Sequence, residues 1–192
     1  MDVYEAIVGR RTIRQYDPKP IPRGILEKIA NAGRLAPSAA NLQPLEYVAV
    51  DDAALREKIF PCLKWAAAIS PHGNPRPGHE PTAYVFILVN TLLRDRMFEY
   101  DAGAAIENMA LAAWGEGIAS CWLVSIDKPR IVELLGIPES RRLDSVLALG
   151  YPGQASIVEA MTEGRQKYWQ DPDLTFHVPK RGLADILRFN KF

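Results

Sequence analysis

The chain has 192 residues, a length that suits one domain or one subunit of a tight oligomer, and we expect residues 1–192 to form a single domain. Lys and Arg together number 23, as do Asp and Glu, so the formal net charge is zero and the chain lacks the basic surplus of a general nucleic-acid binder. Hydrophobic residues make up 48% of the chain, which supports a folded core and excludes a disordered protein.

Cysteine and histidine are too sparse and too scattered to indicate a metal centre or a disulfide scaffold. Cys62 and Cys121 are the two cysteines of the chain, and they form no CxxC motif. His72, His79 and His177 have no close His or Cys companion at metal-ligand spacing. The N-terminus lacks an apolar signal segment, and no apolar run is long enough to span a bilayer. We therefore expect no bound metal, no membrane partner and a cytoplasmic location.

The first informative stretch is Arg10-Arg11-Thr12-Ile13-Arg14, which follows a predicted amphipathic helix over residues 2–8 that Gly9 ends. In an extended segment alternate side chains point to opposite sides, so Arg10, Thr12 and Arg14 share one face. Two guanidinium groups and a hydroxyl on one face suit a phosphate, because a guanidinium offers fixed charge and bidentate geometry. The alternative is a solvated basic turn after a surface helix, and the stretch taken alone favours that alternative.

The second informative stretch is the loop of residues 37–44, which has a proline at both ends. Asn41 and Gln43 each carry a donor and an acceptor, so they can read the edge of a planar heterocycle. Ser38 and Ala39 are small enough to let a flat ring approach closely. A turn whose side chains bond their own backbone explains the same residues equally well.

The rest of the chain predicts further helices and strands. Residues 101–114 are apolar nearly all round, which predicts a buried helix, and its alanines suggest packing against a second subunit. Residues 70–81 contain four prolines and two glycines and predict an irregular loop that can cover a pocket. The polar and aromatic tail after residue 153 is expected to pack on a partner subunit. The other predicted helices cover residues 23–35, 53–60 and 127 or 128 to 135, and the predicted strands cover residues 45–50, 84–89, 119–126 and 146–149.

Several common catalytic patterns are absent from the sequence. There is no GxSxG, no convincing Cys–His pairing, no GxGxxG, no P-loop and no obvious carboxylate pair. What remains is two basic clusters, Arg10/Arg14 and Lys180/Arg181, and the amide-rich loop. These groups can hold a phosphorylated planar cofactor, which would carry the chemistry while the protein orients it.

In this order and at these separations, the chain resembles the FMN-dependent nitroreductase family. The resemblance rests on residues 10–14, 37–44, Asp101-Ala102-Gly103, Leu149-Gly150-Tyr151-Pro152 and Val178-Pro179-Lys180-Arg181. It implies an α+β fold with a mixed, mainly antiparallel sheet flanked by helices. It also implies an intertwined homodimer with FMN at the interface, in which the C-terminal tail extends across the partner and adds to its sheet.

The resemblance also implies roles for individual residues. The first motif contacts the phosphate, the ribityl chain and the pyrimidine edge of FMN, and the 37–44 loop of the other subunit contacts the isoalloxazine. Residues 123–125 lie against the N5 side of the flavin, and Lys180 and Arg181 bind the phosphate. The chain departs from the family pattern at Ala39, Leu45 and Val124, and the family's middle flavin contact has only Arg76 and Lys64 as candidates. The implied cofactor-binding residues are Arg10, Arg11, Thr12, Arg14, Pro37, Ser38, Ala39, Asn41, Gln43, Leu123, Val124, Ser125, Lys180 and Arg181.

As a member of such a family, the chain is expected to be an oxidoreductase in which FMN, rather than a protein side chain, is the reacting group. The expected cycle is ping-pong: NADH or NADPH gives a hydride to flavin N5, and the flavin then reduces a nitroaromatic, a quinone or a similar small acceptor. Arg14 or Arg10 is expected to stabilise the reduced ring. The alternatives are a dedicated reductase or dehydrogenase of one metabolite and a non-catalytic FMN-binding or delivery protein.

Overall fold

The computed structural model describes residues 1–69, 73–162 and 164–192 of the chain. Within these residues, a five-stranded sheet forms the centre of the molecule, with β5 and β3 at its middle and β2 at one edge. β1 and β4 both pair with β5, and every pairing between named strands of this sheet is antiparallel. The strands are β1 (Tyr16–Asp17), β2 (Leu45–Val50), β3 (Ala83–Asn90), β4 (Ala119–Leu123) and β5 (Arg141–Pro152).

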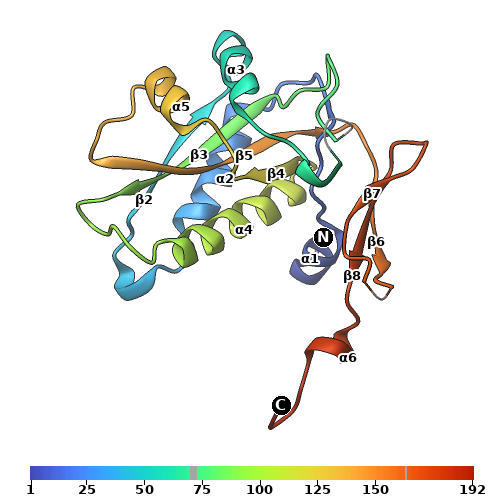
Figure 1. Cartoon of the computed structure of the whole chain (residues 1–192). Helices are drawn as coiled ribbons and strands as arrows, with labels where there is room; N and C mark the ends of the chain where they lie inside the picture. The colour runs from blue at the N-terminus through green and yellow to red at the C-terminus, as the bar shows by residue number, and fades with distance from the viewer. Residues whose placement is uncertain (70–72, 163) are drawn as a thin grey trace.

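Helices cover both faces of the sheet, with α2 and α4 on one side and α3 and α5 on the other (Figure 1). The arrangement follows from β3, whose apolar run alternates between two cores because successive side chains of a strand point to opposite faces. Ala83, Val85 and Ile87 pack with α2 and α4, and Tyr84, Phe86 and Leu88 pack with α3 and α5. The helices are α1 (Val3–Gly9), α2 (Arg23–Arg34), α3 (Ala53–Ile59), α4 (Glu99–Gly115) and α5 (Lys128–Leu135).

The predicted helices are confirmed to within two residues at each end, and their caps explain why they start where they do. The Asp52 side chain accepts a hydrogen bond from the backbone N–H of Leu55, and Asp2 and Asp127 cap α1 and α5 in the same way. The apolar helix predicted over residues 101–114 is α4. It buries one face on the sheet and α2, while Gly103, Ala104 and Leu111 remain partly exposed.

Two strand boundaries differ from the prediction. The strand predicted over residues 146–149 runs from Arg141 to Pro152, because the apolar pattern marks only its buried centre, while its polar ends pair through the backbone. The strand predicted over residues 119–126 stops at Leu123. Beyond it the chain leaves β5 and turns to residues 63–64, where the Lys64 N–H donates to the Ser125 carbonyl at 3.1 Å.

The C-terminal segment forms a second, three-stranded sheet that stands beside α1 (Figure 1). β6 (Ser156–Ala160) runs parallel to β8 (Phe176–Lys180), and β7 (Trp169–Gln170) is antiparallel to β8. After the short helix α6 (Leu183–Ile186), the last residues extend away from the rest of the molecule and are exposed. Exchange of this tail with a second copy of the chain stays a prediction. Among the described residues, no helix has the length and apolarity needed to cross a bilayer.

Candidate functional site

The arginine stretch leaves α1 as an extended segment beside β4. Thr12 forms a parallel bridge with Ser120, and the Ile13 N–H donates to the Ser120 carbonyl at 3.1 Å. Ile13 and Gln15 are buried, so Thr12 and Arg14 lie on the opposite, more open side. The main sheet therefore fixes the register of the stretch and decides which of its side chains face outward.

A cavity of about 240 Å³ brings this stretch together with the C-terminal sheet. Its cations come from both ends of the chain: Arg10, Arg11 and Arg14 from the N-terminal motif and Lys180 from β8. None of its described lining residues is acidic. We call this the arginine cavity, and it is lined by Arg10, Arg11, Thr12, Arg14, Val158, Tyr168, Val178 and Lys180.

Arg14 is held in the arginine cavity by aromatic rings of the C-terminal segment. Its guanidinium carbon lies 5.2 Å from the ring centroids of both Tyr168 and Phe176, which is cation–π distance. Its Nε is buried and has no hydrogen-bond partner among the described residues. Burial raises the pKa of the nearby Cys121 thiol to about 11, so that sulfur stays neutral and leaves the Arg14 charge uncompensated. A buried donor of this kind suits an anionic or carbonyl oxygen from a ligand.

The two preceding arginines are arranged differently from each other. Arg10 Nε donates to Glu107 Oε1 on α4 at 3.0 Å. The Arg11 guanidinium donates to the carbonyls of Val8 and Arg10, and so it caps the carboxyl end of α1. Burial and the neighbouring Arg10 charge lower the pKa of Arg11. Arg11 therefore lines the cavity while most of its donors are turned toward the helix.

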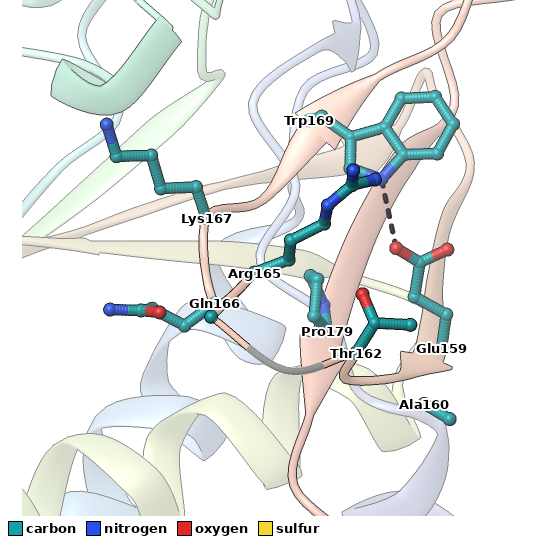
Figure 2. Close-up of a pocket in the computed structure, with 9 residues that line it drawn as sticks. Glu159, Ala160, Thr162, Arg165, Gln166, Lys167, Trp169 and Pro179 are labelled. Atoms are coloured by element: carbon teal, nitrogen blue, oxygen red, sulfur yellow. Dashed lines mark hydrogen bonds between the residues drawn. The ribbon is translucent and has the colours of Figure 1, made fainter.

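The C-terminal sheet has two faces, and only one of them meets the arginine cavity. Val158, Tyr168, Val178 and Lys180 line that cavity, whereas the residues next to them in sequence line a separate hollow of about 620 Å³. Figure 2 shows this outer hollow, in which the indole N–H of Trp169 donates to Glu159 Oε1 at 2.9 Å. Arg181 is exposed and lines a third hollow with Lys180 and Ile186, and of these residues Lys180 alone also lines the arginine cavity.

The 37–44 loop is strained and held from two sides. Ala40, Asn41 and Gln43 have φ angles of 54°, 53° and 49°, a left-handed conformation that costs about 1–2 kcal/mol for a residue with a side chain. The Ala39 N–H donates to Asp101 Oδ1 at 3.1 Å, and the Gln43 N–H donates to Ser38 Oγ at 3.0 Å. Ser38 thus bonds the backbone of its own loop, while the Asn41 and Gln43 side chains remain exposed.

The 37–44 loop and the arginine cavity lie at different places along α4. Asp101, in the first turn of α4, holds the loop, whereas α1 packs near the other end, where a Cβ added to Gly9 would lie 3.1 Å from Trp114 Nε1. At 1.5 Å per residue, Asp101 and Trp114 are roughly 20 Å apart along the helix axis. The loop lines its own cavity of about 130 Å³, which shares no residue with the arginine cavity. Within a single chain, the loop and the arginine stretch therefore line two separate cavities.

The remaining predicted site residues follow β4. Leu123 is buried, and Val124 and Ser125 are exposed beside Lys64, one of the two candidates for the middle contact. The other candidate, Arg76, has an exposed side chain, and its backbone N–H donates to Gln15 Oε1 at 2.9 Å. Of the proline-rich loop, residues 70–72 lie outside the described residues.

The described part of the proline-rich loop does not line the arginine cavity. Its last residues, Glu80 and Pro81, line a hollow of about 300 Å³ with Arg56 of α3 and Tyr84 of β3. Across the residues that the structure describes, no group of three His, Cys, Asp or Glu side chains is placed to hold a metal ion.

The sequence and the structure of this chain were compared with those of known proteins, and one family model matches the sequence. The model of the nitroreductase family matches residues 7–151. A protein of Archaeoglobus fulgidus, whose name combines NADH dehydrogenase with NAD(P)H nitroreductase, is 34% identical over 155 residues, which span 76% of this chain and 83% of that protein. The NADH dehydrogenase of Thermus thermophilus is 27% identical over 192 aligned positions, covering 80% and 88% of the two chains. The crystal structure of a nitroreductase with bound FMN from Bacteroides fragilis superposes with a TM-score of 0.65 at 29% identity, covering 86% of this chain and 97% of that one.

Proposed function

The chain belongs to the nitroreductase family, and we propose that it is an FMN-dependent oxidoreductase that takes its electrons from NADH or NADPH. The family and the α+β fold inferred from the sequence are both confirmed. The names of the relatives support a nicotinamide donor, and the FMN in the Bacteroides fragilis nitroreductase supports the cofactor. The observation that carries the proposal is the arginine cavity, where cations from both ends of the chain meet without an acidic neighbour among the lining residues.

The residues of the arginine cavity fit FMN on two counts. Arg10 and Lys180 offer fixed positive charge to a phosphate, and Thr12 adds a hydroxyl beside them. The buried Nε of Arg14 has no partner among the described residues, so it can donate to an oxygen of the flavin pyrimidine edge. Arg181 and the main-chain groups near Val124 and Ser125 belong to the same proposal through the family resemblance.

The cavity of one chain is too small for the whole cofactor. Sites for ligands of this size usually enclose about 300–1,000 Å³, whereas the arginine cavity encloses about 240 Å³. The 37–44 loop, which we assign to the isoalloxazine, lines a separate cavity within the same chain. We therefore propose a homodimer in which the loop residues Pro37, Ser38, Ala39, Asn41 and Gln43 of one subunit complete the site of the other.

Bound FMN would supply the redox chemistry, accepting a hydride from NADH or NADPH and passing two electrons to a small acceptor such as a nitroaromatic or a quinone. Arg14 packs against both Tyr168 and Phe176, so its guanidinium is positioned in advance and would stabilise negative charge on a bound flavin ring. The rings also exclude water from one side of that charge.

The test is the visible spectrum of the purified protein under anaerobic conditions, recorded before and after addition of NADPH and then NADH. A flavin spectrum that bleaches, and recovers when a nitroaromatic or a quinone is added, supports the proposal, and the faster donor identifies the coenzyme. A flavin spectrum that neither donor changes indicates an FMN-binding or delivery protein. A colourless protein that cannot be reconstituted with FMN refutes the proposal, and turnover of one compound class alone indicates a dedicated reductase.

A further inference from the structure

The 37–44 loop keeps an unfavourable backbone shape, so something in the fold must hold it. Residues in the left-handed region persist when the surrounding structure fixes them, and such strain often marks functional sites. Ala40 is the clearest case, because its φ of 54° and ψ of 20° lie inside the short turn Ala39–Asn41 and it has no side-chain polar group to offset the strain. Contacts with the rest of the fold must therefore hold the loop in this conformation.

The main anchor is the carboxylate of Asp101. This side chain is 5% exposed, although it stands in the first turn of α4 where most acidic residues face water. Its Oδ1 accepts the Ala39 N–H at 3.1 Å, immediately before the strained residue. A carboxylate at a helix N-terminus also interacts favourably with the helix dipole.

A second group holds the carboxylate itself. Arg94 Nη1 lies 3.8 Å from Asp101 Oδ2, and the two side chains are 15% and 5% exposed. The Arg94 Nε donates to the Arg96 carbonyl at 2.7 Å, which fixes the guanidinium in place. The buried Oδ2 has no hydrogen-bond partner among the described residues, so Arg94 is its nearest source of positive charge.

The same segment of chain holds the far end of the loop. The Asn90 N–H donates to the Pro44 carbonyl at 2.7 Å, where β3 ends. The end of β3 therefore holds the loop at Pro44 through Asn90, and the start of α4 holds it at Ala39 through Asp101. This two-point attachment links the loop to the end of the central strand and to the start of the buried helix.

We propose that Asp101 is a positioning residue for the flavin site, whose carboxylate holds the loop of residues 38–43 preformed for contact with the FMN that the partner subunit binds. This inference rests on the proposed function, because it takes the loop to be a flavin contact. Asp101 touches neither cofactor nor substrate, and it acts through the Ala39 N–H. Arg94 acts one step further out by orienting the carboxylate.

The experiment measures the FMN dissociation constant of the apo form of the full-length dimer by quenching of flavin fluorescence. Asp101→Ala should weaken FMN binding by about tenfold or more, because it removes a charged hydrogen-bond acceptor that the loop needs. Asp101→Asn should recover most of the affinity, since its amide oxygen can still accept from Ala39. The matched control is Glu99→Ala, which removes an exposed acid from the same helical turn and should leave the constant unchanged.

A second-site variant separates positioning from a general loss of structure. In Asp101→Ala combined with Ala40→Gly, glycine adopts the left-handed conformation without strain, so part of the lost FMN affinity should return. A merely structural role of Asp101 would not be rescued by a glycine in the loop. If Asp101→Ala fails to fold, Ala39→Pro decides the matter: it removes the N–H at the first position of a turn, where proline is tolerated, and should weaken FMN binding similarly.

The outcomes distinguish this inference from the proposed function. A wild-type protein that takes up no FMN refutes both. A wild-type protein that binds FMN, together with a folded, dimeric Asp101→Ala or Ala39→Pro variant of unchanged affinity, refutes the positioning role alone. The positioning role is also refuted if Asp101→Ala loses FMN affinity while neither Asp101→Asn nor the added Ala40→Gly change restores it. Asp101 would then act by stabilising the fold as a whole.

Discussion

The guanidinium carbon of Arg14 lies 5.2 Å from the centroid of the Tyr168 ring, so a residue of the N-terminal motif packs against the C-terminal segment. The two residues are more than 150 positions apart in the sequence. Their contact means that the cavity for the proposed cofactor exists only when the tail has folded against the arginine stretch. Folding of the tail and binding of the cofactor should therefore be coupled.

Arg14→Ala should weaken FMN binding by about tenfold to a hundredfold, because it removes a charge-assisted donor from a partly buried site. It should also slow flavin reduction by NAD(P)H, since the cation that stabilises the reduced ring is lost. Fluorescence titration and anaerobic stopped-flow absorbance give the two values. Arg23→Ala is the matched control, because Arg23 forms an exposed ion pair with Asp51 and lies outside the arginine cavity. Wild-type affinity and reduction rate in Arg14→Ala would show that the assignment of Arg14 is wrong.

Lys180→Gln should reduce the affinity for FMN more than the affinity for riboflavin, which has the same ring but no phosphate. The reason is that Lys180 and Arg10 supply the exposed positive charge of the cavity at the position assigned to the phosphate. Isothermal titration with both ligands at two salt concentrations measures the difference. Arg181→Gln should have a smaller effect, since Arg181 lines a different hollow in this structure. Equal losses for FMN and riboflavin in Lys180→Gln would contradict a phosphate contact.

Gly150→Ala should destabilise the protein by about 1–3 kcal/mol, the usual cost of forcing extra atoms into a packed core. A Cβ at Gly150 would lie 2.6 Å from Cδ1 of Tyr16, whose ring is fully buried. The Tyr16 hydroxyl donates to the Ile13 carbonyl at 2.6 Å, so a displaced ring should also shift the arginine stretch and weaken FMN binding. Chemical denaturation checks the first effect and flavin titration the second. Gly115→Ala is the control, because a Cβ there meets no atom within 4 Å.

The architecture was predictable from the sequence where the signal is local. The apolar run of β3 and the apolar sequence of α4 each specify their element through nearby residues alone, and the structure confirms both. It also confirms the helices predicted over residues 53–60 and 127 or 128 to 135, which begin at the caps Asp52 and Asp127. The ends of β4 and β5 were missed because they depend on pairing partners rather than on apolar pattern. β5 continues wherever β3 offers backbone groups, and β4 stops where the chain turns to pair near Lys64.

The candidate site was predictable only as a set of residue types. Arginines and a lysine at the two ends of the chain indicated an anion site, but their orientation depends on tertiary contacts that no local pattern encodes. Arg11 turns back onto the α1 carbonyls, and Arg14 packs against two rings that come from the tail. Asp101 was visible only as part of a family motif. Sequence reasoning left one signal unused, an acidic residue in the first turn of a largely apolar helix, and the structure supplied its contact with Ala39.

The C-terminal sheet should respond to pH through His177. Its Nε2 lies 3.2 Å from Asp171 Oδ2 and its Nδ1 lies 3.1 Å from Glu159 Oε2, and bonds to these carboxylates raise the pKa of His177 above its usual 6.5. The indole N–H of Trp169, followed by the bond to His177, lowers the pKa of Glu159. The stabilisation from a raised histidine pKa is fully present at pH values below the pKa of histidine in the unfolded chain. It is lost as the pH rises through the pKa of His177 in the folded protein.

The stabilisation from the lowered Glu159 pKa has the opposite sign: it is present above about 4.3, the usual glutamate value, and is lost as the pH falls through the folded value. The C-terminal sheet should therefore be most stable between roughly pH 4.5 and 6.5. Proton NMR of the His177 ring measures its pKa directly. Glu159→Gln should move that pKa back toward 6.5, and an unperturbed titration in the wild-type protein would contradict the contact pair.

Removal of residues 183–192 should weaken the dimer and release FMN while leaving the fold of one subunit intact. Leu183, Ile186 and Phe189 are 68%, 54% and 79% exposed in the single chain, and apolar side chains at this density in a tail need a surface to cover them. Exposed side chains contribute little to the stability of the subunit that carries them, so circular dichroism should change little on truncation. Light scattering should show a shift from dimer to monomer, with FMN affinity falling in parallel because the 37–44 loop no longer reaches its neighbour. The matched control is Lys191→Gln, which alters the tail without changing its apolar side chains. A truncated chain that stays dimeric and keeps its flavin would place the dimer contact elsewhere, with the exposed Tyr4 and Ile7 of α1 as the next surface to test.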